Sequence, residues 1–139
     1  MPYRLLPDVA LADIAFEAEG ATVTGLFESC GRAMTDIMVD RSTLRKRVAK
    51  TLRIAADNDD MLLYDFLTEL IVLKDVDSLL FREFKVHPPQ KGVMTAEVAG
   101  EPIDRVRHRL RNDVKAVTMH MFGVRHEGGR WKATVVLDI

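Results

Sequence analysis

The sequence predicts an α+β fold in which an antiparallel sheet of about six strands packs against two helices. Two segments have apolar residues at helical spacing, and shorter apolar segments are bounded by glycine, proline or polar turns. The predicted order is βαβαββββ, and the run of strands at its end favours antiparallel pairing. With 139 residues the chain can bury a hydrophobic core, so we expect residues 1–139 to form a single domain.

The first half of the chain predicts a strand, a helix and a second strand. Residues 13–19 alternate between apolar and polar side chains, which is typical of a half-buried strand. Thr22 can then cap a helix in which apolar residues recur every three or four positions over residues 23–38. Residues 48–56 follow a polar, basic stretch and predict the second strand.

The second half predicts one more helix and four strands. The acidic run at residues 57–60 favours a helix start, because carboxylates stabilise the positive end of the helix dipole. The apolar helix itself is predicted over residues 61–74. Turns containing proline or glycine end the strands, which we expect over residues 79–87, 93–99, 110–125 and 131–139.

The last predicted strand fixes two carboxylates in space. From Trp131 onward, every second residue is apolar and requires burial on one face, so we expect residues 131–139 to be held in the sheet. Asp138 lies on the opposite face, and Ile139 is the last residue of the sequence. The Asp138 side chain and the terminal carboxylate of Ile139 should therefore lie near each other.

Three aspartates and this terminal carboxylate are candidate metal ligands. Asp13 opens the first strand, Asp40 follows the first helix and Asp138 closes the last strand. Hard cations such as Ca²⁺ and Mg²⁺ bind several carboxylate oxygens, which different elements of a fold can supply. In the alternative, structural interpretation, Asp13 and Asp40 are turn or capping residues and Asp138 is a solvated strand end.

Two clusters of basic residues suggest a different kind of interface. Their charge suits phosphate, but no aromatic side chains are interleaved with them for base stacking, and the formal net charge of the chain is −1. A solvated surface is therefore favoured over a nucleic-acid groove, and an acidic protein partner is a third option. The clusters are Arg41, Arg45, Lys46, Arg47, Lys50 and Arg53, and Arg105, Arg107, His108, Arg109 and Arg111.

Composition and motifs exclude several functional classes. The sequence has no glycine-rich phosphate loop, nucleophile elbow or Cys/His zinc spacing, and so offers no catalytic constellation. Cys30 is the only cysteine, which excludes an internal disulfide, and its place on the apolar stripe of the first helix predicts a core position. We find no signal sequence or membrane-spanning run, so we expect a cytoplasmic protein with no membrane partner.

Several collinear stretches, most specific in the last third of the chain, match the pattern of a known family. Met38-Val39-Asp40 ends the first helix, and residues 63–73 precede Leu79-Leu80-Phe81. The C-terminal block consists of Gly100-Glu101-Pro102-Ile103-Asp104, Arg107-His108, Val114-Lys115-Ala116-Val117-Thr118-Met119-His120, Trp131 and Val135-Val136-Leu137-Asp138-Ile139. Over nearly its whole length the chain thus resembles the archease family.

The resemblance implies an accessory protein and not an enzyme. Archeases assist the GTP-dependent RNA-splicing ligase, and the expected role is to promote guanylylation of the ligase's active-site histidine and so its multiple turnover. The resemblance also supports a divalent-metal site, for Ca²⁺ or Mg²⁺, formed by Asp13, Asp40, Asp138 and Ile139. The ligase is the expected protein partner, and we expect contact with RNA only through it.

The chain departs from the family pattern at one place. The family usually has a His-Thr-Ala-Asp run at the start of the first strand, whereas this sequence reads Val9-Ala10-Leu11-Ala12-Asp13. The aspartate is retained, but any contribution of that histidine to the site or to partner binding is altered. Two other hypotheses stay open: a chaperone-like module that binds an RNA- or DNA-modifying enzyme, and a direct RNA-binding protein that uses the basic clusters.

Overall fold

The computed structural model describes residues 2–6 and 13–139 of the chain. Two α-helices and seven strands in this part confirm the predicted α+β class. Residues 9–12, where the family's His-Thr pair is missing, lie outside the described residues. In chain order the elements are β1 (Tyr3–Leu5), β2 (Asp13–Gly20), α1 (Val23–Met38), the 3₁₀ helix η1 (Arg41–Thr43), β3 (Val48–Ala55), α2 (Asp59–Asp77), β4 (Leu79–Val86), β5 (Val93–Pro102), β6 (Ala116–Glu127) and β7 (Arg130–Asp138).

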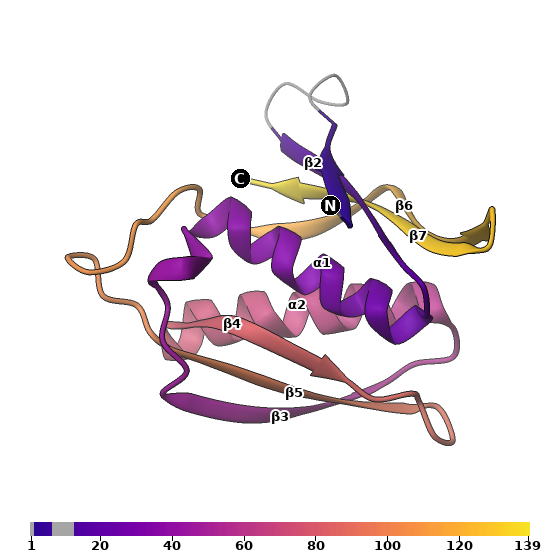
Figure 1. Cartoon of the computed structure of the whole chain (residues 1–139), viewed down its shortest axis with the longest axis horizontal. Helices are drawn as coiled ribbons and strands as arrows, with labels where there is room; N and C mark the ends of the chain where they lie inside the picture. The colour runs from indigo at the N-terminus through magenta and orange to yellow at the C-terminus, as the bar shows by residue number, and fades with distance from the viewer. Residues whose placement is uncertain (1, 7–12) are drawn as a thin grey trace.

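The strands form two antiparallel sheets, so the prediction of one sheet with about six strands was wrong in its arrangement. The first sheet has the order β1-β2-β7-β6 and the second β3-β5-β4. Both helices lie between the two sheets (Figure 1). Helix α2 contacts β3 and β4 of one sheet and β6 of the other. A helix that is apolar on several sides requires cover on several sides, and a second sheet provides it.

Local capping explains where the helices begin and end. The Thr22 side chain accepts a hydrogen bond of 3.1 Å from the Gly25 N–H, which confirms the predicted start of α1. The Asn58 side chain caps the start of α2 in the same way, and Ser78, in the left-handed conformation, ends it. This helix runs from Asp59 to Asp77, beyond both predicted limits of 61 and 74. Asp59 and Asp60 lie in its first turn, as the acidic run predicted.

The predicted strand over residues 110–125 begins later than expected, at Ala116. Two of the preceding residues bond to the end of α1: Arg111 N–H donates to the Met38 carbonyl at 2.7 Å, and Asn112 N–H donates to the Ile37 carbonyl at 3.1 Å. Residues 103–115, here called the clamp loop, thus run from Ser78, past the C-terminal end of α1, to β7. Strand β1 was missed because three residues give no readable alternation.

The final hairpin follows the prediction closely. Gly128 and Gly129 have φ angles of 61° and 76°, which suit a two-residue turn between β6 and β7. Strand β7 pairs with β2 on one side and β6 on the other. Of its predicted inward residues, Ala133, Val135 and Leu137 are buried, whereas Trp131 and Ile139 are partly exposed. Thr134 and Val136, on the predicted outer face, are buried as well. Cys30 is buried in the core, as predicted.

Candidate functional site

The β2–β7 pairing brings two of the predicted aspartates together. In the antiparallel register Asp13 lies directly opposite Asp138, at the end of the first sheet. Residues at opposed positions have Cβ atoms roughly 4.5–5.5 Å apart, and like charges placed so are destabilising. Both residues are partly exposed. Their juxtaposition therefore carries an electrostatic cost that a bound cation would remove.

The chain next to this aspartate pair is held on both sides. Lys115 N–H donates to the Asp138 carbonyl at 2.8 Å, so the end of the clamp loop fastens to the end of β7. Ile139 is partly buried and packs against the hydrophobic core. Ile139 thus has an apolar anchor beside the aspartate pair.

Asp40 performs the capping role that the structural interpretation assigned to it. Its Oδ1 accepts hydrogen bonds from Ser42 N–H at 3.1 Å and Ser42 Oγ–H at 2.6 Å, and it caps η1. These bonds, and then the positive charges of Arg111 and Arg109, lower the pKa of Asp40 below its usual 3.8. The carboxylate is therefore ionised at neutral pH, and the two Ser42 bonds use only its Oδ1.

The four predicted ligands stand in two groups. Asp13, Asp138 and Ile139 lie at the β2–β7 end, and Asp40 lies at the end of α1, which the clamp loop joins to β7. Within residues 2–6 and 13–139, no three His, Cys, Asp or Glu side chains are close enough to hold a metal ion by themselves. The hard oxygen donors suit Ca²⁺ or Mg²⁺ in type, and the metal site stays a prediction.

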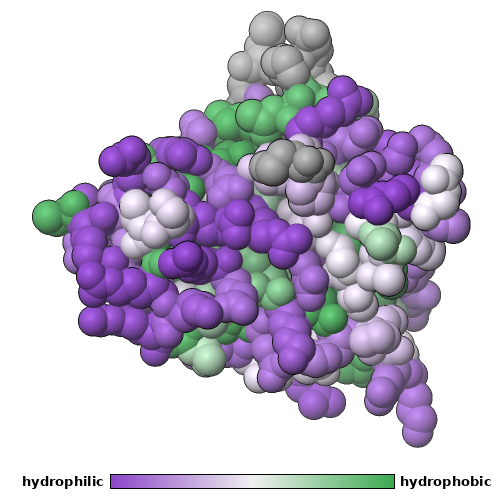
Figure 2. Space-filling model, viewed as in Figure 1, coloured by the Kyte–Doolittle hydropathy of each residue, from purple (hydrophilic) through white to green (hydrophobic). Residues whose placement is uncertain are grey.

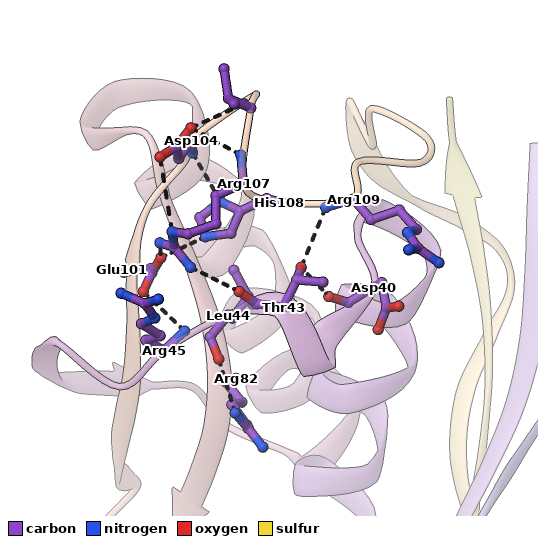
Figure 3. Close-up of polar contacts among 11 residues, drawn as sticks. Asp40, Thr43, Leu44, Arg45, Arg82, Glu101, Asp104, Arg107, His108 and Arg109 are labelled. Atoms are coloured by element: carbon purple, nitrogen blue, oxygen red, sulfur yellow. Dashed lines mark hydrogen bonds and ion pairs between the residues drawn. The ribbon is translucent and has the colours of Figure 1, made fainter.

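A second polar centre, which the sequence did not predict, surrounds the buried carboxylate of Glu101 (Figure 3). Only 1% of Glu101 is exposed. Its Oε1 accepts from His108 Nε2 at 2.6 Å and pairs with the Arg107 guanidinium, and its Oε2 accepts from Arg45 N–H at 2.9 Å. Each oxygen of the buried carboxylate is thus satisfied, as a charge removed from water requires.

The tautomer of His108 follows from its two hydrogen bonds. Nδ1 accepts from Asp104 N–H at 2.9 Å, so the ring proton lies on Nε2 and is donated to Glu101. Burial, with the positive charge of Arg107 beside it, lowers the pKa of His108 below 6.5. A neutral histidine therefore joins the clamp loop to β5 at neutral pH.

The Glu101 centre also fixes the segment that carries Asp40. Arg107 Nη1 donates to the Thr43 carbonyl at 3.1 Å, and Asp40 N–H donates to the Arg109 carbonyl at 2.8 Å. The clamp loop and residues 40–45 are thereby joined at several points (Figure 3). Glu101 and His108 lie in the family-like block of the sequence, which was the available signal, but spacing alone does not reveal that they meet.

The basic clusters are partly neutralised by neighbouring carboxylates. Arg41 pairs with Asp36 at 2.8 Å, Lys46 pairs with Glu83 at 2.8 Å, and Arg107 joins Glu101. The surface over the end of α1 and the clamp loop is nevertheless predominantly hydrophilic (Figure 2). In the described part of the chain, no helix is both long and apolar enough to cross a membrane.

Comparisons with known proteins match this fold and these motifs. Residues 3–139 match the model of the Archease protein family (MTH1598/TM1083). Protein archease of Pyrococcus furiosus is 34% identical over 132 residues, which cover 92% of this chain and 93% of the relative. Protein archease of Methanothermobacter thermautotrophicus is 37% identical over 131 residues, covering 92% of this chain and 93% of that protein.

Solved structures have the same architecture. The solution structure of Methanobacterium thermoautotrophicum protein 1598 superimposes with a TM-score of 0.86 at 33% identity and covers 99% of each chain. A Thermotoga maritima structure described as an archease and possible chaperone has a TM-score of 0.65 at 16% identity, with 96% of each chain covered, which shows a shared fold alone. From the family model and the curated relatives together, we conclude that this chain belongs to the archease family.

Proposed function

We propose that this protein activates the GTP-dependent RNA-splicing ligase, promoting guanylylation of the ligase and its multiple turnover through a divalent cation held by carboxylates. The observation that carries the proposal is the Asp13–Asp138 pair, which the β2–β7 register brings together at the end of a sheet. Membership of the archease family supports the choice of a protein partner, for which we propose the ligase. In this role the protein is an accessory factor and not an enzyme.

The proposed ligands are Asp13, Asp138 and the terminal carboxylate of Ile139, with Asp40 on the neighbouring segment. Opposed carboxylates repel each other, so they are costly to maintain unless a cation or a basic partner group uses them. A bound Ca²⁺ or Mg²⁺ would supply positive charge for phosphate oxygens at the ligase's nucleotide site. The chain's own contribution is to hold the carboxylates on a rigid sheet end, with β7 fixed by strands on both sides.

A multiple-turnover RNA ligation assay with the cognate ligase tests the proposal. We expect stimulation by the wild type and its loss in Asp138→Asn, measured with the accessory protein at a limiting concentration. Asp57→Asn, at an exposed site outside the cluster, removes the same charge and should stimulate fully. Full stimulation by Asp138→Asn would refute the carboxylate mechanism.

A protein-binding module without metal is the second candidate. Met119 and Met121 are 59% and 53% exposed, in a segment of β6 where the register with β7 shifts. Exposed methionines adapt to varied partner surfaces, and the Thermotoga maritima relative is described as a possible chaperone. This candidate would be favoured by two results together. Stimulation of the ligase should survive Asp138→Asn, which removes a proposed metal ligand, and it should be lost in the double variant Met119→Ser, Met121→Ser.

The direct RNA-binding hypothesis has its own test. Binding through phosphate contacts falls steeply as the salt concentration rises, in proportion to the number of phosphates neutralised. RNA affinity of the isolated protein, measured over a series of salt concentrations, should be negligible if RNA is contacted only through the ligase. Tight binding with a steep salt slope would instead support the basic clusters as an RNA surface.

A further inference from the structure

A pocket of about 390 Å³ beside Asp40 gathers three arginines from three separate parts of the chain. Arg41 comes from η1, Arg82 from β4 and Arg111 from the clamp loop. Two aspartates, Asp36 and Asp40, also line the pocket. The carboxylate mechanism proposed above uses none of these arginines beyond the effect of Arg111 on Asp40, so their convergence requires a separate account.

Arg82 and Arg111 are each held by one hydrogen bond to a backbone carbonyl, whereas Arg41 donates to both carboxylate oxygens of Asp36. Arg82 Nη1 donates to the Leu44 carbonyl at 3.0 Å (Figure 3), and Arg111 Nη1 donates to the Asp36 carbonyl at 2.8 Å. Arg41 Nε donates to the Asp36 carboxylate at 2.8 Å. A guanidinium has five N–H donors, so these anchors restrict the side chains without exhausting them. Anchored donors lose less entropy when they bind.

Both acidic side chains of the pocket accept hydrogen bonds within the protein. Asp36 accepts from Arg41 and from the Tyr3 hydroxyl, the latter at 2.7 Å, and Asp40 accepts from Ser42. Burial, with the hydrogen bond to Asp36, raises the pKa of Tyr3 to about 12, so Tyr3 stays protonated and adds no negative charge at neutral pH. In the described part of the chain, Arg82 and Arg111 bond to backbone carbonyls and to no carboxylate. Three arginine charges against the two aspartate charges thus leave the pocket with a net charge of +1.

We propose that this pocket binds the phosphate of a phosphomonoester. A terminal phosphate carries about two negative charges and three acceptor oxygens at neutral pH. Guanidinium forks match phosphate oxygens in bidentate geometry, better than a point charge does. The pocket has a net positive charge, and the guanidinium groups of Arg82 and Arg111, which bond to backbone carbonyls, have further N–H donors for phosphate oxygens. The pocket is large enough to admit the group. The source is free phosphate, a mononucleotide or the phosphorylated end of an RNA strand.

The test uses the isolated full-length protein and three probes: inorganic phosphate, adenosine 5′-monophosphate and a short 5′-phosphorylated RNA. Isothermal titration gives the affinity, and ¹⁵N spectra of the arginine side chains show which guanidinium groups respond. We expect saturable binding with shifts of the Arg82 and Arg111 signals. The double variant Arg82→Gln, Arg111→Gln should bind at least about tenfold more weakly, because two charged hydrogen-bonding groups are lost.

Matched controls separate the pocket from general charge. Arg53→Gln with Arg130→Gln removes two exposed arginines from β3 and β7 and should change the affinity by less than about twofold. Arg82→Lys with Arg111→Lys retains the charge and packing but removes the forks, so it should weaken binding even if the Gln variant unfolds. Among the probes, preference for RNA with a phosphate over RNA with a hydroxyl end identifies a strand end as the source.

Two results would overturn the inference. One is the absence of saturable binding by all three probes below about 10 mM. The other is equal affinity in the wild type and both Arg82/Arg111 double variants. Neither result depends on the ligase or on a metal ion, so this pocket and the proposed function succeed or fail separately.

Discussion

The two carboxylate centres of the molecule have opposite environments. Glu101 is buried and receives donors from His108, Arg107 and Arg45, whereas Asp13 and Asp138 lie partly exposed and face each other across two strands. A buried carboxylate surrounded by donors supports the structure, since it would otherwise be costly to desolvate. Opposed carboxylates work against the structure. The comparison predicts that stability depends on Glu101 and that function depends on the aspartate pair.

The largest effect is expected at Glu101. Glu101→Ala leaves His108, Arg107 and the Arg45 N–H without their acceptor inside the protein, and breaking such a buried ionic group costs about 3 kcal/mol or more. Urea denaturation should show a lower free energy of unfolding. Glu83→Ala, which removes an exposed glutamate from the neighbouring strand β4, should leave the midpoint unchanged. Equal midpoints for both variants would show that Glu101 has no structural role.

The next largest effect concerns pH and His108. Because burial lowers the pKa of His108 in the folded state, the unfolded chain binds more protons near pH 6, and stability falls as the pH decreases below 6.5. The loss between about pH 7.5 and pH 5.5 is at most about 1.4 kcal/mol. His108→Gln keeps a donor for Glu101 but does not titrate, so its stability curve should be flatter. Parallel curves for the two proteins would contradict this prediction.

Metal addition should have a smaller effect at the aspartate pair. If Ca²⁺ or Mg²⁺ binds there, a free concentration five times the Kd stabilises the fold by about 1 kcal/mol through mass action. Differential scanning calorimetry with and without chelator measures this shift. Asp13→Asn should abolish the shift, since it removes one of the two opposed carboxylates. If the melting temperature of Asp13→Asn rises by the same amount, the metal binds at another site.

The smallest effect on stability is expected for Asp40→Asn and Asp138→Asn. Asparagine caps a helix start as well as aspartate does, so η1 should persist without the Asp40 charge. Asp138→Asn removes a repulsion from the β2–β7 pair and should be neutral or slightly stabilising. Both variants should melt like the wild type yet fail to stimulate the ligase. Marked destabilisation of either variant would show that its aspartate supports the fold, as Glu101 does.

The sequence predicted the elements of the fold better than their arrangement. Helical spacing and caps such as Thr22 predicted α1 and α2, and Gly128-Gly129 predicted the last hairpin. The pattern did not show that two sheets enclose the helices, because local periodicity records which face is buried and not which strand covers it. The start of β6 was misplaced for a similar reason: Arg111 and Asn112 bond to the end of α1, a partner far away in sequence.

The candidate site could be predicted in part for the same physical reasons. Asp13 begins and Asp138 ends a strand in which apolar and polar residues clearly alternate. Their positions at strand ends therefore followed from the sequence, although their pairing did not. Asp40 was assigned both a capping role and a ligand role, and the structure shows the capping role. Glu101 and His108 looked like turn and loop residues. Their burial depends on the clamp loop folding over β5, which no local pattern records.

The β2–β7 pairing also has a consequence for folding kinetics. It joins a strand near the beginning of the sequence to the last strand, with both helices and the second sheet between them. Closing so long a loop is entropically costly, and such distant pairings slow folding compared with local contacts. We therefore infer that the Asp13–Asp138 pair assembles late, after the hairpins and helices. Partly folded chains would lack the pair altogether, so only completely folded molecules could compete for its partner.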